Sequence, residues 1–274
     1  MGTQTNYTGS ANWQSAKTET TRAGGGGKIE PKKANSIVGG FVDQMTRASQ
    51  LGFGPPLSSG GGGGGGGGCG GAGRGGGGGG RGGGGGRTGG GRGSARSIGL
   101  GIGGFLADVE RKGFREALAE RGLADVAGKS PDEIALALAD VLGGPTSLIE
   151  ETALRDALMN LTLEWSENAV EMADFESSVV EASQNIESTL HDFFGHYIFE
   201  VFKTVGYQGV LATHGFEKAE SLAGQIRDFI DAKISGLAVT RDLSTIDWNG
   251  ASGAEVIDRI VSDTTEIFGQ EEAK

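Results

Sequence analysis

The chain has 274 residues, 55 of them glycine, a formal net charge of −11 and a single cysteine, Cys69. One cysteine excludes an intramolecular disulfide, and a polar start without a hydrophobic signal region predicts a cytoplasmic protein. No stretch of about 18 apolar residues occurs, so we expect neither a transmembrane helix nor a membrane partner. The acidic balance argues against nucleic acid as the main ligand.

The charges are divided unevenly along the chain. Residues 1–97 carry 11 Lys and Arg against 3 Asp and Glu, a net charge of +8. Residues 98–274 carry 13 against 32, a net charge of −19. The first part is also too polar and too rich in glycine to bury a core of its own. We therefore predict a disordered basic tail over 1–97 and an acidic α-helical domain over 98–274.

The chain begins Met1-Gly2-Thr3, and a second residue as small as Gly2 lets the initiator methionine be removed. Removal exposes the α-amine of Gly2. The myristoylation pattern needs Ser or Thr where this chain has Asn6, so lipidation is not expected. From composition alone, Gly2 is simply a common small residue after methionine.

Apolar residues between Ile37 and Leu51 recur at helix-like spacing. Two interpretations are open at this point. The stretch is either a short helix that orders on a partner or a disordered tail with incidental apolar residues. Gly54-Pro55-Pro56 ends it.

A glycine tract, Gly60–Gly93, contains 27 glycines among its 34 residues. Because glycine has no side chain to bury and loses the most backbone entropy on ordering, we expect a flexible linker with its ends roughly 30 Å apart. Its Arg–Gly units resemble disordered segments that contact RNA and single-stranded DNA. The arginines concerned are Arg74, Arg81, Arg87 and Arg92. No aromatic residue stands between them to stack on bases, so a spacer is the stronger interpretation and nucleic-acid binding the weaker.

Ser94–Gly104 contains four glycines, Gly99, Gly101, Gly103 and Gly104, and is expected to form a hinge. It is not a dinucleotide-binding loop, because no strand pattern precedes it.

From Phe105 onward the apolar residues recur at helical spacing. Ser130-Pro131-Asp132-Glu133 combines a cap, a proline at the first helical position and an acid at the third, which predicts a helix start. The predicted helices lie within residues 105–122, 130–143, 147–165, 168–205, 216–237 and 252–268. The longest run, 168–205, is apolar on several sides near its end and is the expected central helix. The predicted fold class is all-α: a domain of about six helices behind a long disordered, glycine-rich N-terminal tail.

Few residues suggest chemistry. Asp192, His196 and Glu200 recur every four residues, a spacing that can place three metal ligands on one helix face. An ordinary charged helix flank is the favoured interpretation, because no Glu-x-x-His motif or second ligand set accompanies them. Cys69 lies in the glycine tract, where nothing fixes a base beside it. We therefore predict a protein that is not an enzyme, with no catalytic residues, no metal and no cofactor.

Three runs in the first part of the helical region stand out together with the Met1-Gly2-Thr3 start and the glycine-rich tail. They are Leu100–Val109, which reads Leu-Gly-Ile-Gly-Gly-Phe-Leu-Ala-Asp-Val, Gly122–Ser130 and Leu136–Asp140. This combination resembles the QatB family of the bacterial Qat anti-phage defence system. The likeness is strongest over residues 97–165.

The resemblance implies three partners: a QueC-like enzyme (QatC), an ATPase (QatA) and a TatD-like nuclease (QatD). QueC enzymes act on a carboxy-deazaguanine with ATP, and the resemblance implies attachment of a deazaguanine to the N-terminal glycine of a partner protein. Carried onto this chain, the modification acceptor is the α-amine of Gly2. We therefore expect a non-enzymatic defence component whose helical body docks the QueC-like enzyme while the tail presents Gly2, with the glycine tract as a leash. The alternative is a nucleic-acid-binding adaptor that uses the four arginines of the tract.

Overall fold

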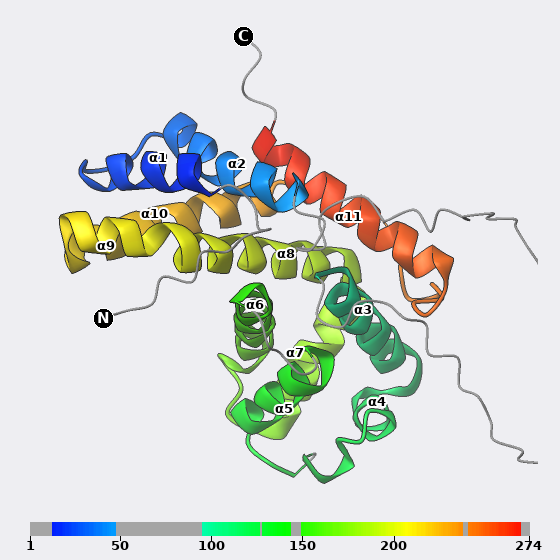
Figure 1. Ribbon diagram of the computed structural model, residues 1–274. Helices are drawn as coiled ribbons and strands as arrows, with labels where there is room; N and C mark the ends of the chain where they lie inside the picture. The colour runs from blue at the N-terminus through cyan, green and yellow to red at the C-terminus, as the bar shows by residue number, and fades with distance from the viewer. Residues whose placement is uncertain (1–12, 48–94, 127, 144–148, 238–240, 270–274) are drawn as a thin grey trace, which may run out of the picture.

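Figure 1 shows a computed structural model of the protein. The structure describes residues 13–47, 95–126, 128–143, 149–237 and 241–269. All regular secondary structure in these segments is helical, which confirms the predicted all-α class. None of the helices in the described segments combines the length and apolarity needed to cross a bilayer.

The helices follow one another along the chain as α1 (Gln14–Gly24), α2 (Pro31–Arg47), α3 (Ala95–Lys112), α4 (Phe114–Glu120), α5 (Pro131–Gly143), α6 (Ile149–Ser166), α7 (Met172–Gln184), α8 (Ile186–Phe202), α9 (Gln208–His214), α10 (Phe216–Ile234) and α11 (Ala251–Gly269). A short 3₁₀ turn, Ala124–Val126, follows α4, and a π-helical turn, Lys203–Tyr207, joins α8 to α9.

Helix α8 is the centre of the fold. Phe193, Phe194 and Tyr197 are fully buried, and apolar side chains cover nearly every side of the helix. A helix that is apolar all round must be enclosed by others. Helices α2, α3, α6, α7, α10 and α11 all pack against it. Figure 1 shows α1, α2, α10 and α11 above α8, α3–α7 below it, and α9 continuing the line of α8 at its left end.

Two helices lie in the segment that was expected to be a disordered tail, so that expectation is wrong for residues 13–47. On α2, Ile37, Phe41 and Met45 are fully buried, and the Phe41 ring meets Phe202 of α8 edge to face at 5.7 Å. Helix α2 also packs against α10 and α11. The apolar spacing after Ile37 therefore does mark a helix, but its partner is the chain's own body. Residues 1–12 and 48–94 lie outside the described residues.

Helix α1 has little sequence signal because it is buried through small side chains. Its inward positions are Ala16, Thr20, Ala23 and Gly24. A side chain at Gly24 would overlap Val210 of α9, so the two helices approach closely at this point. Small residues bury little apolar area each, and the overall hydrophobicity of α1 is correspondingly low.

The expected hinge at Ser94–Gly104 is wrong, because Ala95–Lys112 form one continuous helix. Glycine lowers intrinsic helix stability, but here it permits close packing. At Gly103 the indole of Trp248 lies so near the backbone that a Cβ would come within 2.6 Å of the Trp248 Cη2 atom. The domain boundary expected between residues 97 and 98 therefore falls inside α3.

The described segments contain more helices than the six or so expected. Part of the excess is α1 and α2; the rest comes from breaks inside predicted helices. Gly113, with φ of 89°, separates α3 from α4, and Asn185, with φ of −129°, separates α7 from α8. The predicted helix start at Ser130 is confirmed: its amide donates to Glu133 Oε2 at 3.1 Å, and Ser130 Oγ accepts from the Glu133 amide at 3.4 Å.

Two glycine-to-alanine changes in α3 should have opposite effects on stability. Gly103→Ala should lower the free energy of unfolding by about 1–3 kcal/mol, because the new Cβ overlaps the rigid Trp248 ring. Gly101→Ala should raise it by about 0.5–1 kcal/mol, since its Cβ would lie at an ordinary 3.7 Å from Leu142 Cδ2. Urea denaturation measures both. An equal rise for the two variants would contradict the close approach of Trp248.

Candidate functional site

The residues that the sequence singles out for modification and for nucleic-acid contact lie outside the described residues. These are Gly2, Arg74, Arg81, Arg87 and Arg92. Their roles stay predictions.

Asp192, His196 and Glu200 do lie along α8, but they turn to different partners. His196 Nε2 lies 3.0 Å from Glu164 Oε2 of α6. Glu200 Oε1 accepts hydrogen bonds from Asn160 Nδ2 at 2.9 Å and from Lys203 Nζ at 3.0 Å. Within the described part of the chain, no group of three or more His, Cys, Asp or Glu could hold a metal ion. The three side chains therefore belong to contacts between α8 and its neighbours.

Asp192 is a largely buried carboxyl with a shifted pKa. Burial raises its pKa to about 6; the charges of Glu164 and Asp231 add to the rise, while His196 and Arg227 oppose it. Glu164 also forms an ion pair with Arg227 at 3.2 Å, so its carboxylate is divided between the buried imidazole and the guanidinium. Asp192 is thus a carboxyl that the folded protein favours in the neutral form.

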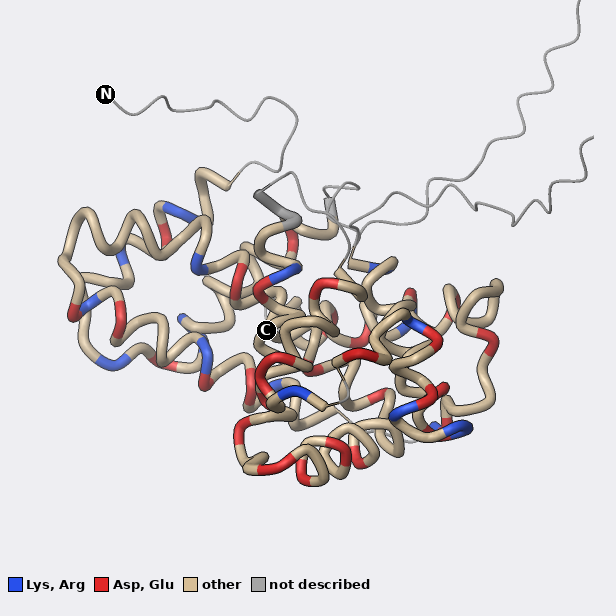
Figure 2. Tube along the Cα trace, turned by 90° about the horizontal axis from the view of Figure 1, so that it is seen from below, with Lys and Arg blue, Asp and Glu red and all other residues tan. Residues whose placement is uncertain are grey.

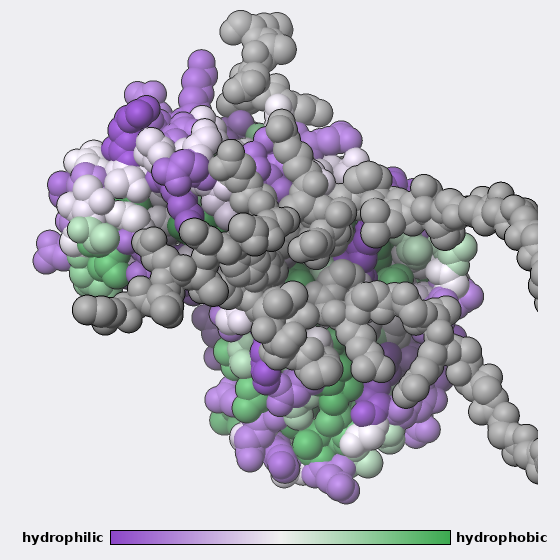
Figure 3. All heavy atoms as spheres, in the orientation of Figure 1, coloured by the Kyte–Doolittle hydropathy of each residue, from purple (hydrophilic) through white to green (hydrophobic). Residues whose placement is uncertain are grey.

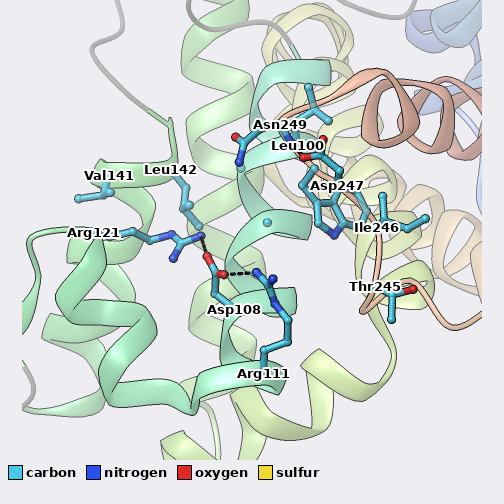
Figure 4. A pocket seen from close by; sticks show the side chains of 13 residues that line it. Leu100, Asp108, Arg111, Arg121, Val141, Leu142, Thr245, Ile246, Asp247 and Asn249 are labelled. Carbon is cyan, nitrogen blue, oxygen red and sulfur yellow. Dashed lines mark hydrogen bonds and ion pairs between the residues drawn. The ribbon is translucent and has the colours of Figure 1, made fainter. Parts of the chain in front are cut away.

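The best candidate for a binding site is a cavity of about 540 Å³ between α3, the end of α5 and the segment that leads into α11. We call it the α3 cavity. Its size falls within the range of small-molecule sites. Figure 4 shows apolar and polar side chains around it. The apolar part of the lining is formed by Leu100, Val141, Leu142, Ile246 and Trp248, and the charged and amide groups are those of Asp108, Arg111, Arg121, Asp247 and Asn249.

Asp108 organises the charged side of the α3 cavity. Its Oδ2 accepts a hydrogen bond from Arg121 Nη2 at 3.1 Å, and its Oδ1 accepts one from Arg111 Nη2 at 2.5 Å. Burial opposes ionisation of Asp108, but the hydrogen bonds and charges of Arg121, Arg111 and Lys112 outweigh it and hold the pKa below its usual value. The Arg121 guanidinium also lies 4.9 Å over the ring of Phe105, which fixes it further. The carboxylate therefore holds both guanidinium groups beside the cavity.

Trp248 forms a wall of the cavity and a wedge between two helices. Its ring lies against Gly103 of α3, and its backbone lies against Gly253, where a Cβ would be 2.7 Å from the Trp248 Cα. The side chain is only 5% exposed. Its indole Nε1 donates to none of the described residues. An unpaired buried donor is uncommon, and the close packing of this ring between two glycines accounts for its enclosure.

Sequence reasoning missed this site, although a signal was present. Gly101 and Gly104 lie one helical turn apart with Asp108 a turn further on, and all three line the cavity. Glycines at that spacing leave one strip of the helix surface without side chains. The remaining contributors come from α5, from Arg121 just after α4 and from Trp248 far along the chain, and no pattern in the sequence links them.

Over the described residues, the fold is all-helical and the α3 cavity is the best candidate site. A family model described as Qat anti-phage system associated protein QatB matches residues 83–268. The chain therefore belongs to the QatB family and is a component associated with the Qat anti-phage system, as the resemblance implied. No curated protein and no solved structure matches. The matched region contains the whole α3 cavity, whereas α1 and α2 precede it.

Replacement of Asp192 by asparagine should stabilise the protein in a pH-dependent way. Because the folded pKa of about 6 exceeds the unfolded value near 4, the folded state binds the proton more tightly, and wild-type stability falls as pH rises through this window. Asparagine stays neutral, so Asp192→Asn should gain about 1–3 kcal/mol at pH ~7.5 and nothing near pH ~4. Urea unfolding at several pH values measures the difference.

The matched control is Asp228→Asn, which changes an exposed carboxylate on the neighbouring helix α10. Its stability difference from the wild type should stay constant across the same pH range. A gain for Asp192→Asn that does not vary with pH would contradict the raised pKa.

Proposed function

We propose that the chain is a non-enzymatic component of the Qat system, whose helical body docks a QueC-like partner enzyme and whose N-terminal segment presents Gly2 for a deazaguanine-type modification. Membership of the QatB family supports a role beside other Qat components. The observation that carries the presentation step is the anchoring of α1 and α2. They fix the start of the described chain against the same body that would dock the partner.

The anchoring limits how far Gly2 can reach. Trp13 packs against Phe41 of α2, with ring centroids 5.8 Å apart, and α1 packs against α9 and α10. A fully extended chain from Trp13 to Gly2 spans at most about 40 Å. This distance is enough for a terminal amine to enter the active site of an enzyme docked nearby, but not that of a distant one.

The glycine tract cannot act as the expected leash for Gly2. It joins α2 to α3, and both helices pack into one body through α8 and α11. Shortening the tract therefore leaves the path from Gly2 to the body unchanged. Residues 3–12 carry out the delivery in this proposal.

The surface supports a docking role for the body. Large apolar side chains are exposed on two neighbouring helices: Leu136 by 46% and Val141 by 43% on α5, and Leu163 by 39% on α6. Figure 3 shows hydrophobic surface on the half of the molecule formed by α3–α7. Acidic and basic positions are interspersed along the described helices, as Figure 2 shows. A mixed polar surface with apolar patches is typical of protein–protein contact.

The chemistry at Gly2 needs only a free amine and an activated carboxyl group. An α-amine titrates near pH ~8, so a substantial neutral fraction is present at physiological pH. Its nitrogen attacks the activated carboxyl carbon, the activating group leaves, and the amine loses a proton as the amide forms. The partner enzyme supplies the activation, so this chain needs no catalytic residue.

Mass spectrometry of protein co-expressed with the QueC-like enzyme of a Qat system tests the proposal. The wild type should carry an adduct on Gly2. Gly2→Glu should retain Met1 and carry none, because methionine is removed only before a small residue. Thr5→Glu, with the same added charge three residues further on, should be modified like the wild type. An unmodified wild-type N-terminus would refute the modification.

Two deletions of equal length separate the short segment from the glycine tract. Deletion of residues 6–12 removes up to about 25 Å of reach and should lower the modified fraction several-fold. Deletion of residues 61–67, seven glycines of the tract, should leave it unchanged. Circular dichroism checks that both variants are folded. If only the tract deletion impairs modification, the tract is the leash after all.

A further inference from the structure

We propose that the α3 cavity binds an organic carboxylate with a compact apolar body. This site goes beyond the proposed function and does not depend on Gly2. The proposal rests on the shape of the cavity, on its apolar lining and on the excess of hydrogen-bond donors at one end.

The apolar lining provides room for the body of the ligand. Gly101 and Gly104 leave the surface of α3 bare, while Leu142 faces it from α5. Val141 is 43% exposed beside them, so a ligand that covers it removes apolar surface from water. Figure 4 shows Val141 and Leu142 above Arg121, with Leu100 further to the right beside Asn249 and Asp247.

The polar end of the cavity has donors to spare and few free acceptors. Both Asp108 oxygens are engaged, Oδ1 by Arg111 and Lys112 and Oδ2 by Arg121. The Arg111 side chain is 59% exposed, and its Nη1 group donates to none of the described residues. A ligand that fits this end must supply hydrogen-bond acceptors, and a guanidinium pairs best with a carboxylate.

Trp248 adds an aromatic wall to the cavity. Its Nε1 is fully enclosed and has no partner among the described residues, so the ligand contacts the ring and not this donor. Asp247, the second carboxylate of the lining, accepts a hydrogen bond on Oδ1 from the backbone amide of Asn249 at 3.1 Å. Figure 4 places Asp247 away from Arg111, across the site. The negative group of the ligand therefore belongs at the Arg111 and Arg121 end.

Two sources could supply this chemistry: a free small acid or the last residue of a polypeptide. The probes are 4-methylpentanoate for the first and acetyl-Gly-Gly-Leu for the second, each with its amide as the uncharged counterpart. The readout is the indole N–H signal of Trp248 in nuclear magnetic resonance spectra of the full chain. The chain has 3 tryptophans, so the signal is assigned by its loss in Trp248→Phe.

At least one carboxylate should shift the Trp248 signal saturably at millimolar concentration, and its amide should bind at least tenfold more weakly. The tighter of the two carboxylates identifies the source. Absence of a saturable shift with both carboxylates, or equal binding of the amides, overturns the proposal.

Three variants locate the binding. Arg111→Gln should weaken it at least fivefold, whereas Arg115→Gln, an exposed arginine on α4 outside the cavity, should leave it unchanged. Gly101→Leu should abolish binding because its side chain fills part of the cavity, and urea unfolding checks that the variant is folded. Unimpaired binding by Gly101→Leu places the ligand elsewhere and overturns the proposal.

Discussion

The buried polar side chains of α8 determine how the surrounding helices sit. His191 Nδ1 lies 2.9 Å from Thr264 Oγ1 of α11, and His196 and Glu200 reach α6 through Glu164 and Asn160. At its start, Glu187 accepts hydrogen bonds from the Arg241 backbone and side chain at 3.2 and 3.3 Å. Apolar packing alone tolerates sliding, whereas an unpaired buried polar group costs about 1–3 kcal/mol. These bonds therefore fix the register of α6, α11 and the segment before α11.

The register of that segment in turn creates the candidate site. Once Arg241 is held on α8, the chain continues to Trp248, which inserts between Gly103 of α3 and Gly253 of α11. The wedge holds α3 and α11 apart at one end and leaves the α3 cavity beside it. The cavity thus forms because Trp248 packs between Gly103 and Gly253. The hydrogen bonds of Asp108 with Arg111 and Arg121 complete its polar end.

Sequence reasoning succeeded where a single helix carries its own signal. The apolar character of α8 and the cap at Ser130 both follow from local spacing, and both are confirmed. It failed where the stabilising partner is remote. Helix α1 buries residues that are too small or too polar to stand out as an apolar stripe, and the glycines of α3 suggest a hinge until Trp248 is placed against them. The α3 cavity was not predictable for the same reason, because its walls come from four separate parts of the chain.

The position of α1 and α2 changes what the N-terminal region can do. A segment tethered only by glycines could sample a volume set by the whole tract. With Phe41 and Met45 buried in the body, the described chain begins at Trp13 against that body, and the glycine tract stands in the sequence between two helices that both belong to it. The number of residues that separate Gly2 from the body is therefore set by residues 3–12, and the length of the tract does not enter it.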